Sequence, residues 1–467
     1  MKIKVDITLT MEDDTEEERA VQVQIEESIP EGLQNLDVWE QNVRNMGFQT
    51  MRSLFRSGME LYEQEVLSGY EHKDKHCHVI RKGKLDFTLT TAMGKVRFSR
   101  KRMLCKTCGE WVTPINEALG LHDDEKERAT LGFKELSSLC ATNQPYRKAM
   151  EMMMRITQDP EIVSHEQIRL MVKREGRRLR QQEEKDRKWS VFYLVRDLLD
   201  RPYHVPTGDG KLYVCLDGIF VRSSSGKNRF HEGKVGFICT DEREPVGCKG
   251  RKFIPKKIYI SSFENSYVLG GRVRGEALKL GLREYKEVFI IGDGARWIRK
   301  IREQYFPGTI YILDWFHLHE KLYEALRLTL PRDSKRRVGA FQEVSNHLWR
   351  GFKRKALEQL RTLRTQMLSE GMKQKTLAQR EGLDELIAYI QNNWEGIVNY
   401  RQMQKDGYLV ASSLVEKAAD LLVAKRQKKK QGMHWTKMGA DGICALRTLW
   451  MNDRWLGYWN QRRERVA

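Results

Sequence analysis

Two stretches of the sequence share one order of parts: an apolar run of strand length, an aspartate, and then a segment with helical spacing. The stretch 288–298 carries Asp293 between two glycines, and the stretch 309–321 carries Asp314. The apolar runs are rich in β-branched residues, which favours strands. In parallel α/β sheets, functional residues lie at the carboxyl ends of the strands. The two units therefore predict an α/β fold with an acidic site at one edge of its sheet.

Two further acidic residues belong with this site. Asp217 interrupts an apolar strand over residues 211–221, where burying a carboxylate is costly unless a cation neutralises it. Glu416 falls in the first turn of a predicted helix that a preceding serine caps. Three carboxylates on separate elements repel one another unless cations hold them, and oxygen ligands favour magnesium or manganese. We therefore expect Asp217, Asp293 and Glu416 to bind Mg²⁺ or Mn²⁺.

These motifs follow one another in a characteristic order: Asp217, Gly292-Asp293-Gly294-Ala295-x-Trp297-Ile298, Asp314-x-x-His317, Val415-Glu416 and Arg426-x-Lys428-x-x-x-Gly432-Met433-x-Trp435. The series resembles bacterial insertion-sequence transposases of the DDE type, in the Kra-type or Lre-type branch that is related to Mutator-like elements. The resemblance covers about residue 85 to the C-terminus. It implies two-metal-ion DNA cleavage and strand transfer, with Asp217, Asp293 and Glu416 as the catalytic residues. It also implies that Asp314, His317 and Trp297 support the active site.

Patterning and the resemblance together predict an α/β fold with a ribonuclease-H-like mixed sheet core and an all-α insertion. The expected parts are an N-terminal strand pair and helix (1–70), a zinc-ribbon-like β unit of short strands (71–122), a helical, helix-turn-helix-like DNA-binding region (123–190), the catalytic core (205–320 and 405–445), the all-α insertion (321–404) and a basic C-terminal tail (446–467). We expect Trp349 and Trp394 to lie in the core of the insertion; stacking on an unpaired base is the alternative.

A metal site of a second kind is predicted near residue 105. Cys105 and Cys108 form a C-x-x-C half site of the kind that binds zinc. The other half would have to come from residues 76–78, where Cys77 is the thiol, but this segment lacks the usual paired spacing. The resemblance implies a zinc ribbon here, and a ribbon-like β unit without metal is the alternative.

Two regions are expected to contact DNA. Residues 160–173 have the form of a second helix of a helix-turn-helix, with Ser164 as N-cap and Gln167 at the reciprocal capping position. A solvated basic helix that links domains is the alternative. The residues that we expect at DNA are Gln167, Arg169, Arg177 and Arg178 in this helix and Lys425, Arg426, Lys428 and Trp435 after the candidate catalytic glutamate.

Composition restricts the partners. The formal net charge is +19 and the isoelectric point is near 9.5, which indicates a polyanionic partner. Eight cysteines with one close pair do not form a secreted disulfide framework, and no apolar run is long enough to cross a membrane. We therefore expect a cytoplasmic, nucleoid-associated protein that binds terminal repeats and target DNA as a homo-oligomer. The alternatives are a metal-dependent nuclease without strand transfer and a domesticated transposase that acts as a DNA-binding regulator.

Overall fold

The computed structural model of the chain divides into two compact units. One comprises residues 1–175 and 455–467, and the other comprises residues 176–454. We call them the N-terminal unit and the α/β unit. The structure describes residues 2–11, 19–28, 36–73, 76–121, 128–199, 208–225, 229–246, 251–330, 334–369, 377–428 and 433–465. None of the helices in these ranges has the length and apolar character that a membrane span needs.

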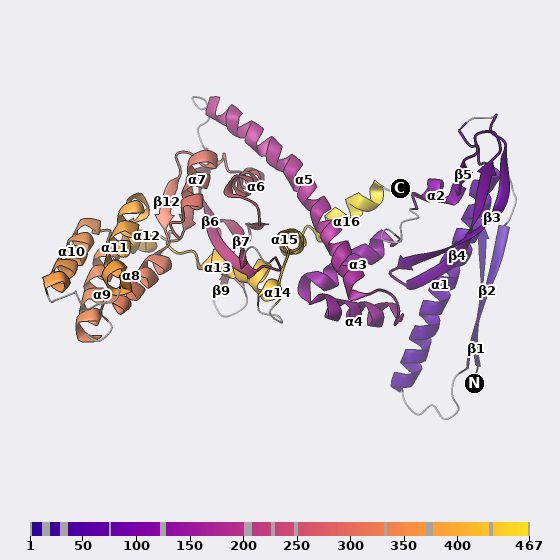
Figure 1. The fold of residues 1–467 in the computed structure, drawn as a ribbon, viewed down its shortest axis with the longest axis horizontal. Coiled ribbons are helices and arrows are strands. Elements are labelled where there is room, and N and C mark those ends of the chain that lie inside the picture. Colours follow the sequence, from indigo (N-terminus) through magenta and orange to yellow (C-terminus); the bar gives the residue numbers. More distant parts are fainter. Residues whose placement is uncertain are drawn as a thin grey trace. The chain divides into compact units, whose positions relative to one another are not determined.

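The N-terminal unit combines two hairpins with helices (Figure 1). Its strands are β1 (Lys2–Met11), β2 (Arg19–Ser28), β3 (Val79–Thr91), β4 (Gly94–Cys105) and β5 (Trp111–Val112), and its helices are α1 (Leu36–Ser68), α2 (Pro114–Leu119), α3 (Leu131–Asn143), α4 (Tyr146–Thr157), the start of α5 (His165–Leu199) and α16 (Trp455–Glu464). The β3–β4 hairpin buries Phe87 and Phe98, against which Phe55 and Met59 of α1 pack. The prediction of short strands here is wrong, because β3 and β4 have 13 and 12 residues.

The predicted start of α5 is confirmed in atomic detail. The Gln167 amide donates to Ser164 Oγ at 3.2 Å, and the Ser164 amide donates to Gln167 Oε1 at 2.9 Å. This reciprocal pair is a capping box. The helix then continues for 35 residues to Leu199, far beyond a helix-turn-helix second helix. The boundary between the two units falls within it, after Glu175.

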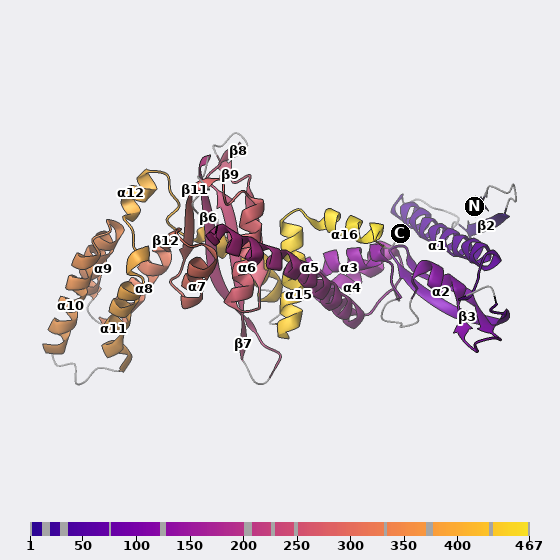
Figure 2. The same ribbon diagram turned by 90° about the horizontal axis from the view of Figure 1, so that it is seen from above.

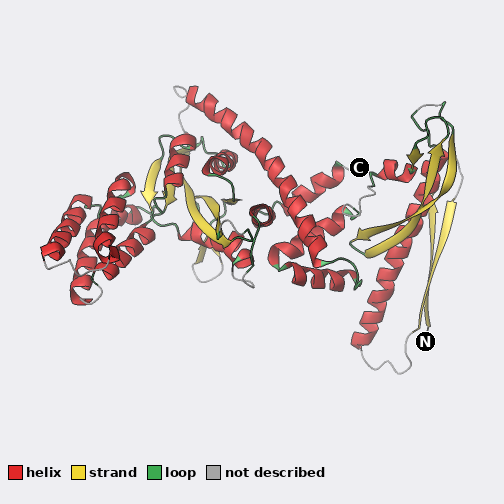
Figure 3. Ribbon diagram, viewed as in Figure 1, coloured by secondary structure: helices red, strands yellow, loops and turns green. Residues whose placement is uncertain are grey.

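The α/β unit is built on a five-stranded mixed sheet, which confirms the predicted α/β class. The strand order is β10-β7-β6-β11-β12, with β7 antiparallel to β6 and β10 and with β6, β11 and β12 parallel. The strands are β6 (Gly208–Arg222), β7 (Phe230–Thr240), β10 (Lys257–Ser262), β11 (Tyr285–Gly292) and β12 (Ile310–Leu313); β8 (Glu244–Val246) and β9 (Arg251–Phe253) form a separate pair. Figure 3 shows helices on both sides of these strands.

The helices around the sheet are α6 (Ser266–Lys279), α7 (Arg296–Tyr305) and α8 (Trp315–Thr329). They follow β10, β11 and β12, so strand and helix alternate as the sequence predicts. Chain residues 334–405 form the α9–α12 segment, which consists of α9 (Ser334–Trp349), α10 (Lys353–Ser369), α11 (Leu377–Asn392), η4 (Trp394–Gly396) and α12 (Tyr400–Lys405). Both ribbon views show these helices gathered beyond β12, at one end of the sheet (Figures 1 and 2).

The two tryptophans of the α9–α12 segment differ in environment. Trp349 packs into an aromatic cluster, with ring centroids 4.7 Å from Trp315 and 5.9 Å from Tyr400. Trp394 is 37% exposed and lies beneath the Lys353 ammonium, 5.1 Å from its ring centroid. The expectation that both tryptophans lie in the core is therefore wrong for Trp394.

The chain after residue 405 returns to the sheet through short helical pieces. These are α13 (Ser413–Ala419), the π-helical turn η5 (Asp420–Ala424), α14 (Lys425–Gln427) and α15 (Lys437–Met451). The described part of the predicted basic tail, residues 446–465, is largely helical: it completes α15 in the α/β unit and forms α16, which belongs to the N-terminal unit.

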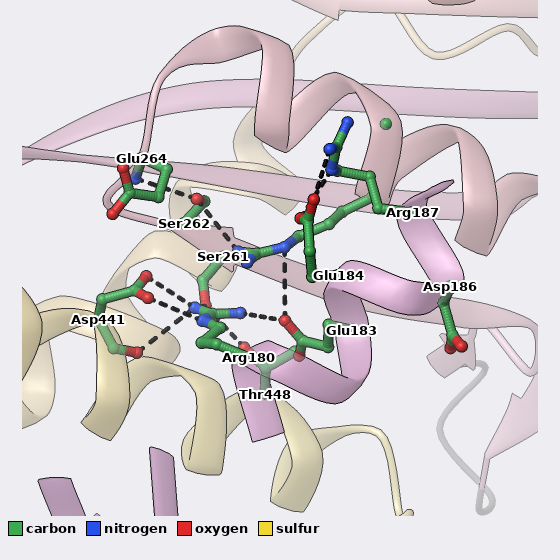
Figure 4. A network of polar contacts seen from close by, with 12 residues as sticks. Arg180, Glu183, Glu184, Asp186, Arg187, Ser261, Ser262, Glu264, Asp441 and Thr448 are labelled. Carbon is green, nitrogen blue, oxygen red and sulfur yellow. Dashed lines mark hydrogen bonds and ion pairs between the residues drawn. The ribbon is translucent and has the colours of Figure 1, made fainter. Parts of the chain in front are cut away.

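A buried ion network joins the second part of α5, from residue 176 on, to the rest of the α/β unit (Figure 4). Arg180 donates from Nε and Nη2 to the Asp441 carboxylate, each at 3.0 Å, and from Nη1 to Glu183 at 2.7 Å. Arg272 Nε lies 3.5 Å from the same Glu183 carboxylate. Because a buried charge is tolerated only when it is paired, these contacts fix α5 against α6 and α15.

Candidate active site and metal cluster

The sheet register brings the first two acids together. β6 and β11 are parallel neighbours in which Leu216 pairs with Gly292. Asp217 and Asp293 are the next residues along the two strands, so both carboxylates lie at the same edge of the sheet. Each accepts a hydrogen bond from a nearby backbone amide, at 2.7 Å for Asp217 and at 2.9 Å for Asp293.

Asp314 positions the third acid. Its carboxylate is fully buried, caps α8 by accepting from the His317 amide at 2.8 Å, and also accepts from the Ser412 amide directly before α13. One side chain therefore joins the starts of two helices. Glu416, in the first turn of α13, is held near the ends of β6 and β12 as a result.

The predicted acids interact electrostatically across these elements. Asp217 is affected by the charges of Asp293, Glu416 and His317. His317 Nε2 lies 3.8 Å from a Glu416 oxygen. This nitrogen is buried, and among the residues that the structure describes it has no hydrogen-bond partner. An unpartnered buried nitrogen beside a carboxylate is a group positioned for a ligand.

The environment of Asp217 favours a bound cation. Burial raises the pKa of Asp217 to about 6, its neighbouring amide and His317 oppose this rise, and the Asp293 and Glu416 charges add to it. The carboxylate is therefore costly to ionise in the protein alone. A divalent cation would remove that cost, and three carboxylates supply the oxygen ligands that Mg²⁺ and Mn²⁺ prefer.

A second group of metal-ligand residue types is packed more tightly than the three acids. Within the described ranges, one group of at least three His, Cys, Asp or Glu residues has all its ligand atoms within 4.8 Å of one another: His72, Cys77, Cys105 and Cys108. The sequence predicts the three thiols but not His72, because its five-residue separation from Cys77 matches no familiar ligand spacing.

The chemistry of this cluster fits zinc. Hydrogen bonds from the Cys108 backbone and side chain, opposed by desolvation, lower the pKa of Cys105 to about 7, so a thiolate is readily available. His72 directs Nε2 to Cys108 Sγ at 3.4 Å and Nδ1 to the Tyr70 hydroxyl at 3.4 Å. A zinc-binding histidine commonly has such a partner at its second nitrogen. Three cysteines and one histidine form a tetrahedral structural donor set.

Comparison with known proteins identifies the family. The model of an uncharacterised protein family, UPF0236, matches residues 9–211 and 278–457, which is most of the chain. The chain belongs to UPF0236.

Relatives within UPF0236 are distant. A UPF0236 protein of Streptococcus gallolyticus, named for the vanSb 3′ region, is 25% identical over 407 residues, covering 84% of this chain and 78% of the relative. A protein of Caldanaerobacter subterraneus subsp. tengcongensis, whose name joins eleven locus designations, is 22% identical over 369 residues, covering 78% and 67% of the two chains.

Trp297 lies close to the acidic site of this UPF0236 protein. A Cβ atom added to Gly218, the residue after Asp217, would lie 3.9 Å from the Trp297 ring and 3.4 Å from Glu232 Oε1. Glu232 pairs with the nearly buried Lys234 at 2.8 Å. Trp297 and this ion pair thus pack against the backbone that carries Asp217, which fits the supporting position expected for Trp297.

The basic residues after Glu416 divide into buried and exposed sets. Arg426 and Trp435 are 1% and 4% exposed, and the Arg426 guanidinium lies 5.1 Å from the Trp435 ring centroid. The prediction that these two contact DNA is wrong, because both are part of the core. Lys425 and Lys428 are exposed and remain candidates. Residues 429–432, which complete the predicted motif, lie outside the described residues.

Trp435 instead extends the β6–β7 hairpin. Its amide donates to the Arg222 carbonyl at 2.9 Å, and its carbonyl accepts from the Ser224 amide at 2.9 Å and lies 3.0 Å from His231 Nε2. The tail motif therefore anchors the chain after Glu416 to the sheet.

The predicted DNA contacts on α5 lie on its surface. Arg177 and Arg178 are exposed. Gln167 is engaged in the capping box, and Arg169 forms a two-point ion pair with Glu166 at 2.8 and 2.5 Å. Any role of the latter two at DNA would have to compete with these local bonds.

A positioning group that sequence reasoning missed lies behind Glu416. The π turn η5 widens the helix directly after α13, and a π turn leaves its carbonyls without their usual α-helical partners. Buried Arg447 of α15 donates from Nε to the carbonyls of Leu421 and Leu422 at 3.1 and 3.0 Å. Arg447 is 6% exposed. Its guanidinium thus holds the turn that follows the third acid.

Proposed function

We propose that this UPF0236 protein is a DDE-type transposase that cuts and joins DNA with a ribonuclease-H-like core, an all-α insertion formed by the α9–α12 segment, and two divalent ions. The observation that carries the proposal is geometric: the β6–β11 register places Asp217 beside Asp293, and Asp314 joins the starts of α8 and α13, the helix that carries Glu416. The strand order, with one antiparallel member followed by parallel strands, agrees with the implied core.

Each side chain has a defined task in this proposal. Asp217 would hold both ions, and Asp293 and Glu416 would hold one each. Bound Mg²⁺ or Mn²⁺ would activate the attacking oxygen and stabilise the leaving oxygen of the phosphodiester. His317 lies beside Glu416 without a hydrogen bond to it, and Asp314 fixes both helices that carry this pair.

Charge and relatives add support. The excess of positive charge lies in residues 176–454, the unit that contains the three acids, and this is where a phosphodiester would bind. The eleven designations joined in one relative's name describe a sequence present at many loci, as mobile DNA is.

We also propose that the N-terminal unit binds structural zinc through His72, Cys77, Cys105 and Cys108. The support is that the four ligand atoms lie within 4.8 Å of one another. The spacing of these residues along the sequence does not show this proximity.

The test is Glu416→Gln, which keeps the shape of the side chain and removes its charge. We expect Mg²⁺-dependent cleavage of DNA to fall by more than about a hundredfold, since even partners outside the ligand shell cost 10- to 100-fold in metal sites. DNA binding in a chelating buffer should be unchanged. Glu303→Gln is the matched control, because Glu303 is an exposed glutamate of α7 away from the three acids.

The outcomes separate the alternatives. Equal cleavage by Glu416→Gln and the wild type would refute the proposal. Cleavage without joining of an end-bearing oligonucleotide to a target identifies a nuclease. Binding of DNA with no cleavage by the wild type identifies a regulator.

A further inference from the structure

A hollow lies in the N-terminal unit, outside the acidic site and the cysteine cluster. Its volume is about 690 Å³, and it is lined by α1, β2, β4 and the chain between α4 and α5: Gln24, Ile25, Glu26, Gln49, Arg52, Ser53, Arg56, Lys95, Val96, Arg97 and residues 158–161. We call it the α1–β4 groove. Figure 1 shows α1 crossing against the β3–β4 hairpin that forms one wall.

One side of the groove is cationic. Arg52 and Arg56 are one helical turn apart on α1, so both lie on one face of the helix. Lys95 and Arg97 are two residues apart on β4, so both lie on one face of the strand. Arg56 and Arg97 are exposed. Among the described residues, the side chains of Arg56, Lys95 and Arg97 have no carboxylate within ion-pair distance, although Glu26, Asp159 and Glu161 also line the groove.

The acidic residues of the lining do not neutralise this wall. Asp159 accepts from the backbone amides of Lys95 and Glu161, at 2.9 and 3.0 Å, so it serves to shape the loop. Glu26 lies on β2 and Glu161 lies in the chain before α5. The cations of the groove therefore belong to α1 and β4, and its carboxylates belong to other parts of the lining.

This concentration of unpaired cations contrasts with the rest of the unit. Acidic residues slightly outnumber basic ones in residues 1–175 and 455–467. Four cations that gather on one wall of such a unit are therefore not a consequence of its average composition. Arg52 is also fixed in place, since its Nη1 donates to the Met93 and Thr157 carbonyls at 3.2 and 3.4 Å.

We propose that the α1–β4 groove binds the phosphodiester backbone of duplex DNA. The proposal rests on the proposed function for the class of ligand and goes beyond it by assigning DNA contact to α1 and β4, which no sequence motif marks. Guanidinium groups bind phosphate oxygens through paired donors, and several cations along an open wall suit a chain of phosphates. The neutral amides of Gln49 and Gln158 and the Ser53 hydroxyl supply further donors of the kind that contact phosphates.

The experiment compares the double variant Arg56→Gln/Arg97→Gln with the wild-type full chain. Affinity for a labelled duplex of arbitrary sequence is measured against salt in a chelating buffer, where cleavage cannot occur. Because each lost phosphate contact reduces the slope of log affinity against log salt by about 0.9, we expect weaker binding and a slope that is shallower by roughly 2. Arg52 is left intact, since it also supports the fold.

The matched control is Lys82→Gln/Lys84→Gln, which removes two exposed charges of the same hairpin outside the groove. Equal affinities and slopes for the Arg56/Arg97 variant and the wild type, or equal losses in both double variants, would overturn the proposal. So would loss of binding to polyglutamate with DNA binding intact, which would identify an acidic protein as the partner. Cleavage is not involved, so this result is independent of the Glu416→Gln outcome.

Discussion

Asp217 is a residue whose burial costs stability in the protein alone. It follows the buried Leu216 in β6, and the charges of Asp293 and Glu416 add to the cost of ionising its carboxylate. Such an arrangement contributes nothing to folding by itself. Relief of this cost by a cation is part of the proposed function.

The pH dependence of stability should reveal this cost. The pKa of Asp217 is raised from 3.8 to about 6 in the folded protein, so between these values the folded state binds more protons than the unfolded state, and stability rises as pH falls through 6. The full penalty, at most about 3 kcal/mol, applies above pH 6. Without metal, Asp217→Asn should therefore be the more stable protein at neutral pH and should converge with the wild type near pH 4.

Chemical denaturation in a chelating buffer across this range measures the effect. Parallel stability curves for the two proteins would show that Asp217 titrates normally and that the three acids do not interact as described.

The proposed zinc ligands make a prediction of the same scale. We expect elemental analysis to find zinc in the purified wild type and to find it lost from His72→Ala, because the tetrahedral set then lacks one ligand. His78→Ala is the matched control, since His78 is exposed and lies outside the cluster. Equal zinc content in the His72→Ala variant and the wild type would exclude His72 as a ligand.

At the scale of elements, the third acid depends on a helix that is not regular. α13, which carries Glu416, has only two turns before the π turn η5 follows it. Arg447 of α15 donates hydrogen bonds to the Leu421 and Leu422 carbonyls of η5. The position of Glu416 is therefore set from a neighbouring helix.

Arg447→Gln should lower both stability and activity. The Leu421 carbonyl loses its donor and the Leu422 carbonyl keeps the weaker Cys444 thiol donor at 3.7 Å, at about 1–3 kcal/mol for an unsatisfied buried group, and α13 loses its support. Cleavage at saturating DNA should fall while DNA affinity stays constant, and Arg447→Lys should restore part of the rate. Denaturation and single-turnover cleavage measure the two effects, with exposed Arg401→Gln as the control. Full activity in Arg447→Gln would show that η5 does not position the acid.

The sequence predicts elements better than it predicts what their side chains contact. Apolar periodicity locates the strands that carry Asp217 and Asp293, and local capping chemistry locates the start of α5. Long-range contacts leave no such pattern. Nothing near His72 indicates that it joins Cys77 and the C-x-x-C thiols, and the aromatic and basic residues of the tail motif give no sign that Arg426 and Trp435 pack against each other in the core.

At the scale of the whole molecule, the two units have different electrostatics. Residues 176–454 carry the positive excess, and the N-terminal unit is close to neutral. The overall charge of +19 therefore predicts a polyanionic partner without showing that the positive excess lies in residues 176–454. The expected homo-oligomer, which would bring two element ends together, remains a prediction.

The α9–α12 segment has a consequence for control of the protein. Its Tyr389 hydroxyl donates to the Asp293 carbonyl at 2.6 Å, and Asn393 lies so close to Gly294 that a Cβ there would be 2.6 Å from its Oδ1. The α9–α12 segment is far from Asp293 along the chain, but it thus contacts the loop that carries this acid. We therefore expect an antibody fragment or small molecule that binds the α9–α12 segment to block the proposed DNA cleavage from outside, without competing for the proposed metal or nucleic acid.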